Sequence, residues 1–104
     1  MDAVEELAAR RFVLVDDQGV RRAELSAQGP GMVGLRVYGG GDSSATVSVG
    51  ISEESGRRPA IVLRKEAEDG QGYGGVILDI SRYGDASLVL EDADGTSRKL
   101  TAKE

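Results

Sequence analysis

The sequence contains no cysteine and no histidine, and its aromatic residues are few. Without cysteine there is no disulfide, and nothing indicates an oxidising compartment. Without either residue the chain lacks Ser–His and Cys–His nucleophiles, common metal ligands and the usual base at neutral pH. One Phe, three Tyr and no Trp supply little of the large side chains that fill a core. We therefore expect a thin core, part of which neighbouring chains supply.

Basic residues are also in deficit, with 13 Lys and Arg against 18 Asp and Glu and a net charge of −5. Nucleic acid and anionic membranes are therefore not expected as partners. No stretch approaches the roughly 20 apolar residues of a membrane span. Residues 1–10 lack the basic start and apolar run of a secretory signal. The default expectation is a cytoplasmic protein, with a phage particle or the cell surface as the other settings left open.

One segment, residues 2–10, has a helical pattern, because good helix formers place three apolar side chains on one stripe. We expect a short amphipathic helix over residues 1–11 and a β-hairpin-repeat domain over residues 12–104. So short a helix needs a surface to pack on. It either caps the β domain or ends a parallel helix bundle that gathers several chains. The candidate residues for this oligomer interface are Val4, Leu7, Ala8 and Phe12.

After Arg11 apolar and polar residues alternate, which is typical of half-buried antiparallel strands. Glycine-bearing turn signals separate the alternating runs, and we expect positive φ at Gly19 and Gly95. The strands expected from this alternation are residues 12–16, 20–26, 32–38, 45–51, 60–65, 75–81, 86–91 and 96–101.

The chain also contains a degenerate repeat. Residues 12–25 parallel residues 88–100, and residues 33–51 and 60–80 follow the same strand–turn–strand plan. Repeats of this size form stacked units, none of which buries its apolar face alone. The sequence predicts an all-β fold: an antiparallel meander, sandwich or open barrel of about four hairpins, or eight strands, led by the short helix.

The first repeat reads F-x-L-x-D-x-x-G-x-x-R-A-x-L over residues 12–25. It resembles hairpin repeats in uncharacterised bacterial proteins, where such repeats often follow a helical segment. The resemblance implies an architecture and no activity. The residues that carry it are Phe12, Leu14, Asp16, Gly19, Arg22, Ala23 and Leu25.

Two motifs resemble ligand sites. Residues 70–75 match G-x-G-x-x-G, but a dinucleotide site needs a helix after the glycines, and a β-branched run follows here. Residues 92–95 place two aspartates before a glycine, but the glycine comes too early for an EF-hand loop. We interpret both as hairpin turns, with a weak calcium site between subunits as the alternative for the second. No catalytic, cofactor or metal residues are expected.

These observations favour a non-enzymatic structural or assembly module that self-associates. We expect a closed homo-oligomer, with a trimer preferred over a dimer. The module presents loops to a protein partner and serves as a particle or fibre component. The alternative is a binding module for a small, carbohydrate-like ligand that uses loop carboxylates and tyrosines. The candidate loop contacts are Tyr38, Tyr73 and Tyr83.

Overall fold

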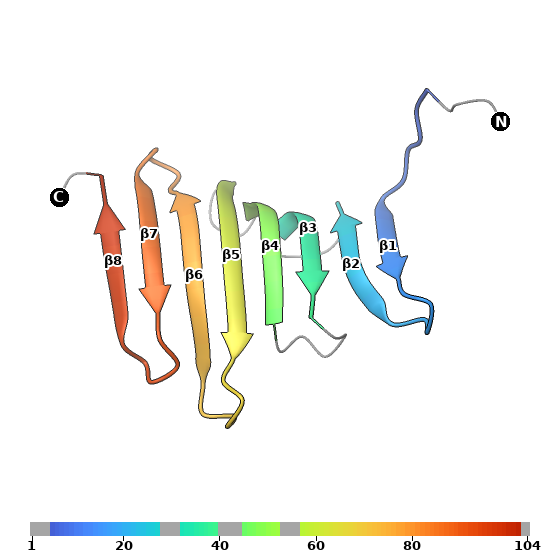
Figure 1. The fold of residues 1–104 in the computed structure, drawn as a ribbon. Coiled ribbons are helices and arrows are strands. Elements are labelled where there is room, and N and C mark those ends of the chain that lie inside the picture. The colour runs from blue at the N-terminus through green and yellow to red at the C-terminus, as the bar shows by residue number, and fades with distance from the viewer. Residues whose placement is uncertain (1–4, 28–31, 40–44, 53–56, 103–104) are drawn as a thin grey trace.

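The computed structural model describes residues 5–27, 32–39, 45–52 and 57–102. It shows one open sheet of eight antiparallel strands that lie side by side in chain order (Figure 1). The fold is thus the meander among the three expected all-β architectures. The strands are β1 (Arg11–Val15), β2 (Arg21–Ser26), β3 (Met32–Tyr38), β4 (Ala45–Ser52), β5 (Arg58–Glu66), β6 (Tyr73–Ile80), β7 (Ala86–Glu91) and β8 (Ser97–Thr101).

Short turns with a common hydrogen-bond plan connect several of these strands. In the β1–β2 turn Gly19 N donates to Asp16 O at 3.0 Å, and Asp16 N donates to Val20 O at 2.9 Å. The β7–β8 turn repeats this plan, since Gly95 N donates to Asp92 O at 3.0 Å. Both glycines have positive φ, as predicted. The glycine therefore lets each strand reverse directly onto its neighbour.

The β6–β7 turn follows the same plan but was not expected from the sequence to be a matching repeat. Gly84 N donates to Ser81 O at 2.9 Å, and Ser81 N donates to Asp85 O at 2.9 Å. The Ser81 hydroxyl accepts hydrogen bonds from the backbone N–H groups of Tyr83 and Asp85. Ser81 takes the place of Asp16 in the β1–β2 turn, whose Oδ1 accepts from the backbone N–H groups of Gln18 and Val20. Because serine and aspartate differ as residue types, the repeat is not apparent from sequence identity.

The expected N-terminal helix is not present in the described residues. Residues 5–10 form no helix, and all of them are exposed. The prediction is wrong because a segment of this length is helical only when packed on a surface, and Leu7 is 72% exposed. Residues 1–4 lie outside the described part of the chain. In the part that is described, no helix is long and apolar enough to span a membrane.

The sheet is a single layer, so it encloses no hydrophobic core. Among the described residues no apolar side chain is buried, and only Ser48 is classed as buried, at 9% exposure. The radius of gyration is 16.4 Å, against about 13 Å for a compact chain of this length. The expectation of a thin core is confirmed in an extreme form. Both surfaces of this single layer therefore face solvent.

Candidate functional site

Cross-strand pairing divides the side chains between two opposite faces, and one of them is apolar. Leu25 pairs with Phe12 on one side and with Leu35 on the other, and the pairing continues without interruption to β8. Because directly paired residues share a face, this register makes one row across all eight strands. The row consists of Phe12, Leu25, Leu35, Val49, Ile61, Leu78, Leu88 and Leu100.

A second row lies beside the first on the same face and is apolar on seven of its eight strands. Only its last member, Arg98 on β8, is charged. We call the surface formed by these two rows the apolar face. The second row consists of Leu14, Ala23, Val37, Val47, Leu63, Val76, Leu90 and Arg98.

The apolar face is open to solvent along its whole length. Val47, Ile61 and Leu63, on the central strands, are 40%, 40% and 42% exposed. No described segment lies over them, since all the described strands belong to the one sheet. Two shallow grooves of about 620 and 670 Å³ follow this face, the first lined by Val47 and Leu63 and the second by Val49 and Ile61. Apolar surface of this extent is typical of an interaction site.

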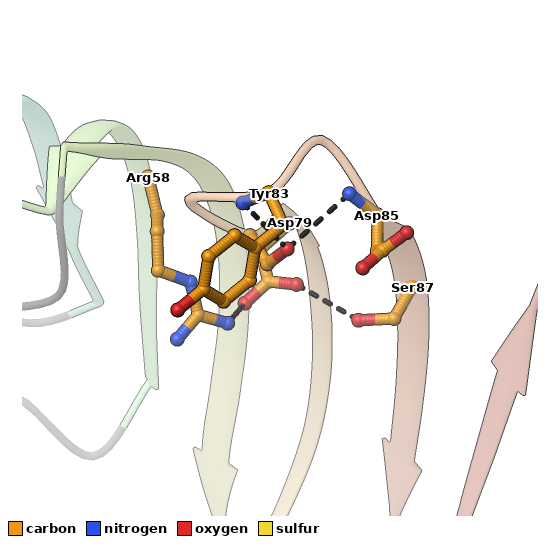
Figure 2. Close-up of polar contacts among 6 residues, drawn as sticks. Arg58, Asp79, Tyr83, Asp85 and Ser87 are labelled. Atoms are coloured by element: carbon orange, nitrogen blue, oxygen red, sulfur yellow. Dashed lines mark hydrogen bonds and ion pairs between the residues drawn. The ribbon is translucent and has the colours of Figure 1, made fainter.

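The opposite face, which we call the polar face, carries ion pairs and hydrogen bonds between neighbouring strands. Arg58 on β5 forms an ion pair with Asp79 on β6, and the Ser87 hydroxyl on β7 donates to Asp79 Oδ1 at 2.8 Å. Figure 2 shows these three side chains joined across neighbouring strands. This row of contacts ties three strands together. The Asp79 carboxylate is therefore engaged on both sides, by the Arg58 guanidinium and by the Ser87 hydroxyl.

A second polar cluster lies on the same face around Glu24 of β2. Tyr38 donates to Glu24 Oε1 at 3.0 Å, and Arg11 Nε donates to Glu24 Oε2 at 2.9 Å. The Tyr38 hydrogen bond lowers the pKa of the Glu24 carboxyl, burial opposes that effect, and Arg11 lowers the pKa further. The cluster links β1, β2 and β3. Its geometry is that of a structural cross-link between strands.

The structure places the sequence-predicted interface residues in different settings. Phe12 lies on the apolar face at its β1 end and is 43% exposed. Leu7 and Ala8 are exposed and precede the sheet, and Val4 lies outside the described residues. Of the three candidates that the structure describes, Phe12 alone belongs to the apolar face.

The three candidate tyrosines do not converge on one loop surface. Tyr38 is half-buried and bonded to Glu24. Tyr73 begins β6 and is 51% exposed, whereas Tyr83 is 82% exposed in the turn after that strand. Tyr73 and Tyr83 thus lie at opposite ends of β6. Tyr83 instead contacts its neighbour Arg82, whose Cζ lies 6.0 Å from the ring centroid.

Both motifs that resemble ligand sites are hairpin turns, as interpreted from the sequence. The glycine-rich residues 70–75 span the end of the β5–β6 turn and the start of β6, with no helix after them. In the β7–β8 turn Asp94 Oδ1 accepts from Thr96 N at 2.8 Å, so this carboxylate is engaged in the turn itself. Within the described ranges no cluster of three or more acidic side chains is arranged to hold a metal ion.

Comparison of the chain with protein-family models, curated proteins and solved structures found no match.

Most residues of the apolar face were missed as interaction residues by sequence reasoning. Alternation identified them only as the buried side of half-buried strands, without indicating what covers that side. These residues could have been found by comparing the number of strands that have an apolar side with the number of elements able to cover those sides. Eight strands each present one apolar side, and none of the described elements lies over it.

Proposed function

We propose that this chain is a non-enzymatic assembly module that self-associates by packing its apolar face on the apolar face of a second copy. The observation that carries the proposal is the uninterrupted apolar row across all eight strands, exposed in the single chain. Two such faces brought together form a β-sandwich, in which the sheets pack about 10 Å apart. The pair then has the core that one copy lacks.

The exposed area supports an extensive, permanent interface. The chain exposes 7922 Å² of surface, which is about 2,300 Å² more than a compact monomer of 10.9 kDa. The uncovered apolar face and the exposed residues 5–10 both contribute to this excess. Obligate homodimers commonly bury about 2,000–5,000 Å² in total. Covering this face in two copies falls within that range.

The width of the sheet favours pairs over the trimer preferred from the sequence. Eight strands about 4.8 Å apart make a sheet roughly 34 Å wide. Three sheets of this width, closed into a prism, would leave a central channel that their side chains cannot fill. Two sheets face to face leave no such space, because their side chains interdigitate. We therefore propose an even number of copies per assembly, with the chain serving as a structural part of a larger particle or fibre.

Light scattering of two matched variants tests this proposal. Val47→Glu places a carboxylate on the apolar face, where a second copy would leave it buried and unpaired. Thr46→Glu gives the same net charge one residue away, on the polar face and opposite Arg64. We expect Val47→Glu to halve the assembled mass at micromolar concentration and Thr46→Glu to leave it unchanged.

Two further measurements distinguish a loss of association from a loss of folding. Circular dichroism should show that Val47→Glu retains its strands, because Val47 is 40% exposed in the single chain. Should that variant not fold, Val47→Thr retains the β-branched shape and is expected to raise the dissociation constant at least tenfold. Equal masses for both glutamate variants, or a wild-type protein that scatters as a single chain, would contradict face-to-face assembly.

A further inference from the structure

The sheet ends at β1 in an edge that has a neighbour on one side only. Among the described strands β1 pairs with β2 alone (Figure 1). Its apolar side chains are exposed on both faces: Val13 to 40%, Leu14 to 63% and Val15 to 53%. An unpaired, apolar strand edge is a template for pairing with another strand.

The hydrogen bonds at the two ends of β1 reveal which backbone groups point outward. Arg10 O accepts from Ala27 N at 3.0 Å, and Asp16 N donates to Val20 O at 2.9 Å. Residues 10 and 16 therefore face β2. Backbone groups alternate in direction along an antiparallel strand. It follows that the N–H and C=O groups of Arg11, Val13 and Val15 point away from the sheet, where another strand would meet them.

The two edge strands differ in whether they carry residues that hinder pairing with a further strand. Edge strands that avoid pairing usually carry lysine, proline or other charged residues. The far edge, β8, carries Arg98 and Lys99. The only charged residue of β1 is Arg11, whose guanidinium is bound to Glu24 of the same sheet, with Nη2 2.7 Å from Oε2. Thus β8 is protected against a second strand and β1 is not.

We propose that β1 pairs antiparallel with β1 of a second copy, about a two-fold axis that passes through Val13. In this register Val13 lies opposite the partner's Val13, and Arg11 opposite the partner's Val15. These are the residues whose backbone groups point outward, so each can form a hydrogen-bonded pair. Phe12 then lies opposite the partner's Leu14, both on the apolar face.

This edge pairing uses a surface separate from face-to-face packing and is compatible with it. The two-fold axis is perpendicular to the sheet, so both apolar faces remain on the same side and form one wider face. Packing two such double sheets face to face gives four chains with two kinds of isologous interface, a common closed symmetry. The expected mass is four times the 10.9 kDa chain.

Two proline variants test the edge. Val13→Pro removes an N–H that points away from the sheet, so it costs no hydrogen bond within the chain. Lys99→Pro makes the same change at the other edge. Its N–H also points outward, because Thr96 O accepts from Asp92 N and therefore faces β7. We expect Val13→Pro to halve the assembled mass and Lys99→Pro to leave it unchanged. An unchanged mass for Val13→Pro, or a mass halved by Lys99→Pro, would overturn the two-fold β1 pairing.

Combining variants separates this proposal from the face-to-face one. With both interfaces present, Val47→Glu leaves dimers joined at β1, and adding Val13→Pro to it leaves single chains. If face packing fails but edge pairing holds, Val47→Glu changes nothing while Val13→Pro still halves the mass.

Amide hydrogen exchange of the unmodified protein gives a readout that does not depend on a variant folding. The Val13 amide should be protected in the assembly although it lies on an edge of the single sheet. Its exchange at the rate of a solvent-exposed amide would overturn the pairing.

Discussion

Gly19 and Gly95 close their hairpins with φ values of +80° and +93°, in the left-handed region. A Cβ built on either glycine meets no atom within 4 Å. Substitution there would therefore act through backbone strain alone. Gly34 represents a different requirement, because a Cβ at that position would lie 2.7 Å from Gly50 Cα on the paired strand. The sequence pattern could indicate the first kind of glycine but not the second, which depends on strand register.

Alanine substitution should separate these effects. We expect Gly19→Ala to lower the free energy of unfolding by about 1–2 kcal/mol, the cost of left-handed backbone for an L-residue. Gly74→Ala is the control, since it has no positive φ and its Cβ would be 3.6 Å from Glu91 O, an ordinary contact. Urea unfolding at one protein concentration measures both. Equal losses for the two variants would show that turn strain is not the cause.

Acid should weaken the sheet through carboxylates that are stabilised in the folded state. The backbone N–H groups of Val20 and Gln18 lower the pKa of Asp16, and Arg22 adds a smaller effect. Hydrogen bonds from Thr96 lower the pKa of Asp94. Each folded pKa lies below its unfolded value, so the unfolded chain binds more protons between the two. The stability that these groups supply is present above the unfolded pKa and is lost as pH falls through the folded pKa.

This loss can be attributed by substitution. Asp16→Asn removes one titrating group but retains a side-chain oxygen that can accept the same two backbone hydrogen bonds. We expect the variant to lose less stability than wild type between pH 7 and pH 3, when urea unfolding is followed at fixed concentration and ionic strength. The same pH dependence in both proteins would mean that Asp16 makes no contribution.

At the scale of elements, the alternation of apolar and polar residues predicted all eight strands, six of them to within a residue at each end. The exceptions are β5 and β6, each of which begins two residues earlier than predicted. The predicted strand began at residue 60, after Pro59, yet Pro59 lies within β5 and is paired with Ile51. It fits there because pairing of β5 with β6 begins only at Ala60, so Pro59 has a partner on one side.

The N-terminal helix was mispredicted because periodicity within a segment does not show whether a surface is present for it to pack on. Helical periodicity in residues 2–10 describes which side chains could share a stripe, but a helix so short also needs a docking surface. None of the described strands provides one for Leu7. The candidate site was predictable only in part. Composition indicated a thin core, and Phe12 was among the predicted interface residues. The apolar rows, in contrast, depend on cross-strand register, which periodicity within one strand cannot specify.

At the scale of the whole molecule, a sheet without a core should depend on its neighbours for stability. If folding and association are coupled, the melting temperature rises with protein concentration. We expect a rise of several degrees between 1 µM and 100 µM for wild type, and a smaller rise for Val47→Glu, measured by circular dichroism. A melting temperature independent of concentration would show that a single copy is stable with its apolar face uncovered.

The chain-order arrangement of the strands also bears on how such a protein can evolve. Each described strand pairs only with the strands before and after it in sequence, and none of the eight returns to close the sheet. Duplication of one hairpin would therefore widen the plate by two strands without rearranging any existing pair. The shared turn plan of residues 16–20, 81–85 and 92–96 is the trace that such duplications would leave. The number of strands can thus change by duplication of hairpins. Such changes are limited only once the surface that covers the apolar face has to match it in width.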